Sequence, residues 1–523
     1  MNQNLKNRKV SRDNLTRRRF ISACAVCSSC IIASPFLHVR SASAIEPVSV
    51  KPKIRLVFCE APNDKPIWPN IGYDFKYRRD QLLKSLRSGC PDVDFLPVVV
   101  LSSEEAKKWL EHDSEVDGYL IYILGLTWQQ EPLMFCRLGK PTLLVDDLYG
   151  GSGEFLTQLP VALSEKLPVE WVSSSSIHDV VDSARCFKVL KKPGKSKDDF
   201  VFACRQIRLK NTKKTRKLSF INDPVIIPDF DNALKRLGEK KILFIGGGWG
   251  GDEFRKAAGT LLGTQLVQLP FEDLSILYDQ ADRNEGEQFA QDWITHAKEI
   301  VEPGHEEIIN SGLLYVAMKN LMRKHDADGI SINCLGGFYG GHLKAYPCLG
   351  FSQLNNDGLV GGCEADQMSA LTMMVGNTLT GRPGFISDPV IDTSKNQIVY
   401  AHCVAPTKIF GPDGEVNPYL IRDHSEDRKG ASIQSLLPTG YMTTTFEIDP
   451  MRKEVIFHQA RSAENIDEDK ACRTKLAAEV IGDIEKMTTG WKWGWHRVTF
   501  YGDLKPHLEE FCNRFNMKMT EEA

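Results

Sequence analysis

Residues 361–389 read Gly-Gly-Cys-Glu-Ala-Asp-Gln-Met-Ser-Ala-Leu-Thr-Met-Met-Val-Gly-Asn-Thr-Leu-Thr-Gly-Arg-Pro-Gly-Phe-Ile-Ser-Asp-Pro, and they set the architecture of the chain. Apolar side chains recur in this segment at spacings of three and four, which predicts a helix: Met368, Leu371, Met374, Val375 and Leu379. Asp366 is the predicted N-cap, because its carboxylate can accept from unpaired N–H groups of the first turn. The helix should end at Gly381-Arg382-Pro383, because proline cannot continue it. Residues 385–390 then read as a short strand.

Two carboxylates flank this predicted helix: Glu364 just before it and Asp388 on the strand after it. A strand–helix–strand unit of this kind can bring both side chains to the same end of a sheet. There they would hold a divalent cation or carry out acid–base chemistry on a small polar substrate. The alternative interpretation is local: Glu364 caps or forms a salt bridge, and Asp388 is a turn residue before Pro389.

The composition is that of an ordinary globular protein. The chain has 523 residues, 42% of them apolar and 25% charged, which is enough for about three domains. The formal net charge is −3 and no block of like charge interrupts the body of the chain, which argues against nucleic-acid or anionic-membrane partners.

The N-terminus has the pattern of a twin-arginine signal peptide over residues 1–44. A basic region ending in Arg17-Arg18-Arg19 precedes a mildly apolar run, residues 20–37, and the small-residue exit Ala42-Ser43-Ala44. This order predicts export to the periplasm, and the alternative is a basic tail without structure. The apolar run is too short for a stable membrane span. Three of the 14 cysteines fall in this segment, and the scattered remainder predicts buried thiols, without a disulfide framework or cysteine-ligated zinc.

The predicted fold class is α/β: two Rossmann-like parallel-sheet domains followed by a mostly antiparallel β-barrel. Strand and helix patterns alternate over residues 53–187 and again over 241–350, as in parallel sheets covered on both faces. Residues 188–240 are the predicted connector, with a helix in it. Residues 351–517 are the predicted C-terminal domain, with the metal site and a small barrel, or a sandwich as the alternative.

The last part of the chain is rich in strand patterns. Residues 441–448 and 454–459 flank a turn and predict a hairpin. Residues 491–503 predict one last long strand, in which a period of two puts the tryptophans at 491, 493 and 495 on one face and His496 on the other. A bulge at Gly494 would change this arrangement. A lone histidine is more often structural than a ligand, and His402 carries the same caution.

A glycine-rich segment follows the predicted strand at residues 241–245. Gly246, Gly248 and Gly251 match the dinucleotide fingerprint, in which glycines let the backbone approach a pyrophosphate. The acidic residue that should close the next strand is missing, because Glu272 lies just beyond it. A tight turn of a Rossmann-like domain, with no cofactor, is therefore the favoured interpretation.

The C-terminal third resembles the L-fucose isomerase and L-arabinose isomerase superfamily. The motifs that carry the resemblance are Pro347-Cys348-Leu349, Asn356-Asp357-Gly358, Cys363-Glu364-Ala365-Asp366, Leu379-Thr380-Gly381-Arg382-Pro383, Ala401-His402-Cys403 and the closing segment from His496 to Asp503. The two α/β units upstream agree with that superfamily in architecture alone.

This resemblance implies a metal-dependent aldose–ketose isomerase that acts on a deoxy-hexose or pentose through a cis-enediol. In L-fucose isomerases a Glu, an Asp and a C-terminal His hold manganese, and these roles fall here on Glu364, Asp388 and His496. Mg²⁺ is the alternative cation. The two carboxylates are also the implied catalytic groups, and their spacing suits the fucose branch better than the arabinose branch, where the second ligand is a Glu and another His joins.

Trp495 stands where the fucose enzymes carry a smaller polar residue, which makes it a candidate substrate-binding residue and leaves the sugar open. The resemblance also implies a homo-oligomer, a trimer or hexamer. Two other function classes remain: an exported NAD(P)-dependent sugar oxidoreductase, which the glycine-rich segment would suit, and a sugar-binding homologue without turnover.

Overall fold

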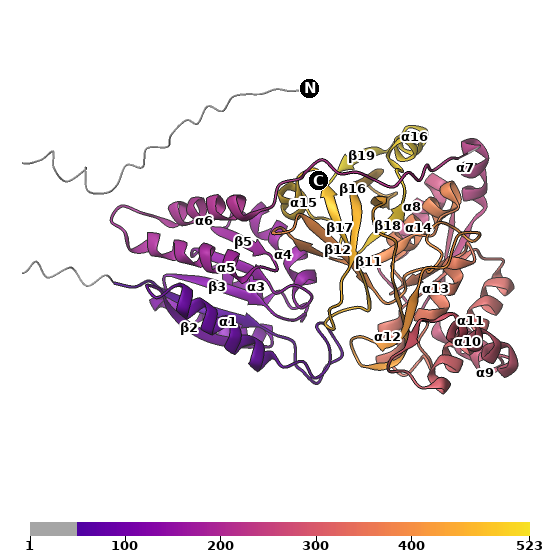
Figure 1. Ribbon diagram of the computed structural model, residues 1–523, viewed down its shortest axis with the longest axis horizontal. Helices are drawn as coiled ribbons and strands as arrows, with labels where there is room; N and C mark the ends of the chain where they lie inside the picture. Colours follow the sequence, from indigo (N-terminus) through magenta and orange to yellow (C-terminus); the bar gives the residue numbers. More distant parts are fainter. Residues whose placement is uncertain (1–49, 228) are drawn as a thin grey trace, which may run out of the picture. The chain divides into compact units, whose positions relative to one another are not determined.

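The computed structural model describes residues 50–227 and 229–523, so the predicted signal peptide at residues 1–44 lies outside the described residues. The described chain begins with a parallel sheet in the order β2-β1-β3-β4-β5 (Figure 1). Its strands are β1 (Lys53–Cys59), β2 (Asp94–Val100), β3 (Gly118–Ile123), β4 (Thr142–Asp146) and β5 (Val169–Ser173). Apolar runs such as Leu-Ile-Tyr-Ile in β3 are buried throughout, as expected for a sheet covered on both faces.

Helices cover both faces of this first sheet. One face carries α1 (Phe75–Gly89), α5 (Ile177–Ala184) and α6 (Lys197–Asn211). The other face carries α2 (Ser103–Leu110), α3 (Glu131–Cys136) and α4 (Ser152–Ser164). Helix α6, in the predicted connector, packs against the first sheet through Phe200 and Cys204.

A second parallel sheet follows, in the order β10-β9-β6-β7. Its strands are β6 (Lys241–Ile245), β7 (Gln265–Leu269), β9 (Gly329–Ile332) and β10 (Val360–Cys363). The accompanying helices are α7 (Phe230–Glu239), α8 (Gly251–Leu262), α9 (Phe271–Asp279), α10 (Arg283–His296), α11 (His305–His325), α12 (Cys334–Tyr339) and α13 (Cys348–Asn356). A small separate sheet pairs β8 (Glu299–Ile300) with β13 (Tyr419–His424) and β13 with β14 (Lys429–Ser435).

A six-stranded antiparallel barrel completes the fold, which confirms the predicted fold class. Its order is β15-β18-β11-β12-β17-β16, and the pairing of β15 with β16 closes it. The strands are β11 (Phe385–Asp392), β12 (Gln397–His402), β15 (Met442–Asp449), β16 (Glu454–Asn465), β17 (Thr474–Ile481) and β18 (Arg497–Tyr501). Helix α15 (Ile484–Thr489) lies between β17 and β18, α16 (Lys505–Phe515) follows β18, and β19 (Lys518–Glu521) adds to the edge of β16.

The segment 361–389 contains the predicted helix, but the predicted sheet partnership is wrong. Helix α14 (Gln367–Thr380) is capped by Asp366, which accepts from Met368 and Ser369, and it ends at Gly381 in the left-handed conformation. The two carboxylates belong to different sheets, because β10 pairs in parallel with β9 whereas β11 pairs antiparallel with β12. Helix α14 therefore carries the chain from the second sheet into the barrel.

The predicted long strand at residues 491–503 is also shorter than expected. Only Arg497–Tyr501 pair as β18, because Trp493 and Gly494 have positive φ values of 66° and 81° and break the extended conformation. The predicted hairpin is confirmed, with β15 and β16 flanking the turn at residues 450–453. The cysteines of the described residues are all free and buried, as predicted. Among these residues, no helix has the length and apolar character needed to cross a membrane.

Candidate metal centre

The register of the barrel strands brings three polar side chains to one mouth of the barrel. Ser387 pairs with Arg497, so His496, the residue before β18, lies next to Asp388. Asp388 pairs with Ala401, so His402 at the end of β12 lies at the same level. Glu364 reaches this mouth from the carboxyl end of β10, with φ of 61°, and Ala365 follows with φ of 49°. Two consecutive non-glycine residues in the left-handed region store strain of about 1–3 kcal/mol each, as is common at functional sites.

Glu364, Asp388, His402 and His496 form one cluster, in which one ligand atom from each lies within 4.8 Å of the others. His496 Nε2 is 3.2 Å from Asp388 Oδ1 and 3.6 Å from Glu364 Oε2. His402 Nε2 is 3.8 Å from Glu364 Oε1 and 3.9 Å from Asp388 Oδ2. Asp388 and His402 are buried, and Glu364 is partly open. A cation placed among these atoms would therefore have protein on most sides and an opening beside Glu364.

The ionisable side chains of the cluster lie close together and are largely buried, and both effects shift their pKa values. Burial raises the pKa of Glu364, and repulsion from Asp388 adds to the effect, although His496 opposes it. Burial disfavours the charged form of His496, but Glu364, Asp366 and Asp388 outweigh it and raise the pKa of the imidazole. The negative charge of two adjacent carboxylates is thus only partly compensated by side chains, which favours binding of a cation.

Asp366 holds His496 from the side opposite the cluster. Its Oδ2 lies 2.9 Å from His496 Nδ1, while Oδ1 caps α14. Burial alone would raise the pKa of Asp366, but the hydrogen bonds from His496 and Ser369 lower it. The carboxylate therefore accepts the Nδ1 proton, so loss of the other imidazole proton to a binding cation leaves the Nε2 lone pair of His496 directed at the cluster.

The glycine-rich segment after β6 packs on the loop that carries Glu364. A Cβ on Gly248 would overlap the carbonyl oxygen of Ala365, and one on Gly250 would lie 3.0 Å from the Cβ of Gln367. Gln367 N–H also donates to the carbonyl of Trp249 at 3.2 Å. Glycines are thus required at two positions for close packing of one loop on another. This packing explains Gly248 without reference to a dinucleotide.

Three tryptophans from distant parts of the chain meet beside the cluster. The Trp495 ring lies 4.8 Å from that of Trp68 and 5.8 Å from that of Trp128. Its Nε1 donates to the carbonyl of Pro389 at 2.8 Å, which fixes the indole beside the strand of Asp388. In α4, a Cβ on Gly153 would lie 2.8 Å from the Trp495 ring and 2.9 Å from that of Trp128, so the bare glycine lets both indoles approach.

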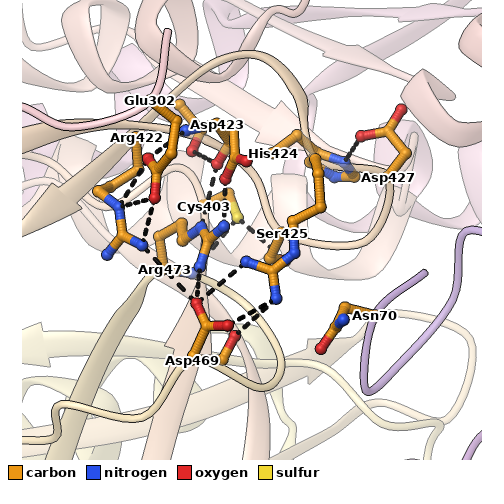
Figure 2. Close-up of polar contacts among 12 residues, drawn as sticks. Asn70, Glu302, Cys403, Arg422, Asp423, His424, Ser425, Asp427, Asp469 and Arg473 are labelled. Atoms are coloured by element: carbon orange, nitrogen blue, oxygen red, sulfur yellow. Dashed lines mark hydrogen bonds and ion pairs between the residues drawn. The ribbon is translucent and has the colours of Figure 1, made fainter. Parts of the chain in front are cut away.

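An ionic network centred on the buried Arg473 lies beside Cys403, the residue after His402 (Figure 2). The Arg473 guanidinium pairs with Asp423 and, at 2.9 Å, with Asp469, and its backbone N–H donates to Cys403 Sγ at 3.5 Å. The preceding residue, Cys472, places its Sγ 3.9 Å from Asp388 Oδ2. The network therefore fixes two segments that contact the cluster, the one after β12 and the one before β17.

The structure brings together all three predicted metal ligands, Glu364, Asp388 and His496, and places Trp495 beside them. Sequence reasoning missed two members of the site. His402 was treated as structural, and the only available signal was its motif with Ala401 and Cys403. Asp366 was assigned only the capping role, and no sequence pattern indicates its contact with a histidine 130 residues away. Asp388 as the second carboxylate suits the fucose branch, whereas a second histidine suits the arabinose branch.

No known protein-family profile matches the chain. Among curated proteins, the chain is 25% identical over 201 residues to the sulfoquinovose isomerase of Clostridium sp. (strain MSTE9), which is 37% of this chain and 44% of that protein. It is also 25% identical over 303 residues to the sulfoquinovose isomerase of Priestia megaterium (strain ATCC 12872 / QMB1551), which is 55% of this chain and 65% of that protein. These sugar isomerases are distant relatives. The similarity supports the fucose/arabinose isomerase-like superfamily without distinguishing its branches.

Proposed function

We propose that the chain is a metal-dependent aldose–ketose isomerase. The observation that carries the proposal is the buried cluster of Glu364, Asp388, His402 and His496 at the barrel mouth. The similarity to sulfoquinovose isomerases supports the same reaction type. The matched stretch covers less than two thirds of these relatives, so the proposal concerns the reaction type and leaves the sugar open. Sulfoquinovose, a hexose with a sulfonate at C6, is the first substrate to test.

The residues of the cluster fit a hard divalent cation such as Mn²⁺ or Mg²⁺. Two carboxylates and one imidazole with a free Nε2 lone pair form an oxygen-rich donor set, which favours these ions over zinc. His402 Nε2 is a buried polar atom without a hydrogen-bond partner among the described residues, which marks the space between these side chains as a polar site. Glu364, Asp388 and His496 would hold the ion.

A bound divalent cation would supply a Lewis acid for the sugar carbonyl and C2 hydroxyl. The chain itself supplies the proton transfers. One carboxylate, Glu364 or Asp388, accepts the C2 proton while the C1 carbonyl oxygen gains a proton, which gives a cis-enediol. Return of the carbon-bound proton to C1, with loss of the O2 proton, gives the ketose. General acid–base catalysis of this kind contributes about 10²–10⁴-fold.

The tryptophans beside the cluster provide the wall against which a sugar would lie. Trp128 is exposed and Trp495 is half-buried, whereas Trp68 is buried against Trp495. Their rings would exclude water from the enediol and orient the substrate by contact with its apolar face. We assign substrate binding to Trp495 on this basis.

The test is a metal-dependent exchange assay with a panel of aldoses: sulfoquinovose, L-fucose, D-arabinose and L-arabinose. Purified protein is incubated in D₂O with MnCl₂, and NMR follows deuterium at C1 or C2 together with ketose formation. We expect Mn²⁺-dependent exchange with at least one sugar and its loss in Glu364→Gln and Asp388→Asn. Exchange that persists in Glu364→Gln, or absence of exchange with every sugar, contradicts the proposal.

Asp392→Asn is the matched control. Asp392 lies in β11 like Asp388 and is equally buried, but its carboxylate accepts from Ser175 and Ser394. A loss of exchange in Asp388→Asn together with retention in Asp392→Asn separates the chemistry of the cluster from the stability of the strand.

Two further parts of the proposal concern the whole protein. Export to the periplasm is supported by the arginines and the apolar run within residues 1–44, and cell fractionation tests it. Assembly as a homo-oligomer is supported by the resemblance to the superfamily, and light scattering on the purified protein tests it.

A further inference from the structure

A cavity of about 640 Å³ lies at the carboxyl edge of the first sheet. It is lined by the ends of β4 and β5, by the start of α1 and by the segment before β17, and none of the four cluster residues contributes to it. In open parallel sheets, ligands bind outside the carboxyl ends of the strands. The volume falls within the range of about 300–1,000 Å³ that is usual for small-molecule sites.

Four tyrosines line this cavity: Tyr73, Tyr77, Tyr122 and Tyr149. Such rings offer both an apolar face and a hydroxyl, which suits a ligand that carries C–H groups and hydroxyls together. Tyr77 is 63% exposed, and Tyr122, in β3, is 1% exposed. The set therefore runs from the rim of the cavity to its floor.

The charges that line the cavity compensate one another. Arg78 Nε lies 3.0 Å from Asp147 Oδ1, and Lys470 Nζ lies 3.8 Å from Asp147 Oδ2 and 5.8 Å from the centre of the Tyr149 ring. Glu468 adds a second carboxylate to the lining, which makes two lining cations, Arg78 and Lys470, beside the carboxylates of Asp147 and Glu468. Asp146 accepts from two serine hydroxyls, at 3.0 Å each, and burial raises its pKa to about 7. Lys470 therefore already occupies the face of the Tyr149 ring. Each cation that lines the cavity has a carboxylate beside it, so the lining does not favour an anionic ligand.

The floor of the cavity presents a hydroxyl without a partner. Tyr122 is buried, and its hydroxyl has no hydrogen-bond partner among the described residues. A buried polar group of this kind is costly unless a ligand or water satisfies it. Tyr122 is one of the residues that line the cavity, so a ligand that reaches its hydroxyl would supply the missing partner.

We propose that this cavity is a second binding site, separate from the metal cluster, for a neutral polyhydroxylated ligand the size of a monosaccharide. Calorimetric titration of the full chain carrying Glu364→Gln and Asp388→Asn tests it, because those changes disable the metal cluster. The neutral probes are D-glucose, D-galactose, D-xylose and myo-inositol, and the charged probes are D-glucosamine and D-glucuronate. We expect at least one neutral probe to bind at one site per chain, more tightly than both charged probes.

Substitutions in the cavity, outside the metal cluster, test whether the neutral probe binds there. Tyr122→Phe should weaken it about five-fold, the effect of one hydrogen bond, and Gln81→Trp on the exposed face of α1 should abolish it by filling the cavity. Tyr119→Phe is the matched control, because Tyr119 lies in the same strand, equally buried, but packs on the opposite face of the sheet. Equal effects of Tyr119→Phe and Tyr122→Phe, tighter binding of a charged probe, or no binding of any neutral probe overturns the proposal. The readout is independent of turnover, so it stands or falls separately from the isomerase assignment.

Discussion

His496 Nδ1 lies 2.9 Å from Asp366 Oδ2, and this contact ties the last candidate ligand in the sequence to the N-cap residue of α14. The same aspartate accepts from Met368 N–H at 2.9 Å and from Ser369 N–H at 3.2 Å through its other oxygen. The start of α14 and the orientation of the imidazole are therefore set by one side chain. Carboxylates that hold a ligating histidine in this way fix its tautomer and increase its basicity.

We expect Asp366→Asn to keep the cap and lose the metal. The amide oxygen can still accept from the first turn, but the amide NH₂ then faces Nδ1 and favours the tautomer with its proton on Nε2. Mn²⁺ affinity should fall by about 10–100-fold, as measured by isothermal titration calorimetry. Asp449→Asn is the control, because Asp449 also caps a turn, accepting from Met451 N–H at 2.9 Å, but lies outside the cluster. An equal loss in both variants would mean that the effect is general destabilisation.

The glycine-rich segment provides a second prediction. In Gly248→Ala the new methyl group would overlap the carbonyl of Ala365 and displace the loop that carries Glu364. We expect kcat to fall by about ten-fold or more, the effect of a small misplacement of a catalytic group. Gly247→Ala is the comparison, because Gly247 has φ of 84° but nothing within 4 Å of its Cβ position. Gly247→Ala should lose about 1–2 kcal/mol of unfolding free energy from backbone strain and retain kcat. A larger loss of kcat in Gly247→Ala than in Gly248→Ala would refute the packing argument.

Much of the fold could be predicted from the sequence because its signals are local. The apolar spacing from Met368 to Leu379, the cap at Asp366 and the stop at Gly381 define α14 within a few residues. The buried strand runs and the helices between them define parallel sheets for the same reason. The strand predicted at residues 491–503 failed because Trp493 and Gly494 adopt the left-handed conformation, which alternation of residue types does not report.

The site was predictable only where the resemblance assigns a role to a residue. It assigns metal binding to Glu364, Asp388 and His496. His402 and Asp366 stand in the family motifs too, but their roles follow from the register of β11 against β12 and from a contact across the barrel mouth. Register is set by pairings between distant segments and therefore cannot be read from one strand alone. The same reason explains why both carboxylates were expected in one sheet.

Removal and addition of metal should change stability. Burial raises the pKa of Glu364, and repulsion between the Glu364 and Asp388 carboxylates raises it further. A bound cation would relieve this repulsion. We expect MnCl₂ at 100 times its Kd to stabilise the folded chain by about 2.7 kcal/mol and a chelator to reverse the effect, as measured by thermal unfolding. The increase should vanish in Asp388→Asn and persist in Asp392→Asn. Equal stabilisation of all three proteins would place the ion elsewhere.

Glu522 should stabilise the barrel in a pH-dependent way. Burial opposes its charge, but Arg497 and His458 outweigh burial and lower the pKa of Glu522 from 4.5 to about 2. The stabilisation is therefore fully present above pH 4.5 and is lost as pH falls through the folded value. Glu522→Gln should cost about 3 kcal/mol at pH 7, and the difference from the parent should shrink between pH 4.5 and pH 2 in urea titrations. Glu521→Gln, at the exposed neighbouring position, should change stability by less than about 1 kcal/mol at either pH.

The two histidines of the cluster should differ in their roles, because their Nδ1 atoms make opposite hydrogen bonds. His402 Nδ1 accepts from the backbone N–H of Cys403 at 2.8 Å, so the neutral ring carries its proton on Nε2 and presents a donor to the carboxylates. His496 Nδ1 donates to Asp366, so its Nε2 presents a lone pair. We therefore expect His496→Gln to weaken Mn²⁺ binding by about 100-fold or more, beyond the ~10–100-fold typical of partners outside the ligand set.

His402→Gln should keep Mn²⁺ affinity within about ten-fold of the parent, the lower end of the effect expected for a partner of the ligands, because the glutamine amide can replace the Nε2 donor that faces Glu364 and Asp388. Its effect should fall on kcat, since His402 Nε2 lies 3.8 Å from Glu364 Oε1 and 3.9 Å from Asp388 Oδ2, and one of these carboxylates accepts the C2 proton of the sugar. Calorimetry with Mn²⁺ and the deuterium-exchange assay, run on both variants, separate the two roles. If His402→Gln loses Mn²⁺ as completely as His496→Gln, then His402 is itself a ligand, and its contact with the Cys403 N–H must break when the ion binds.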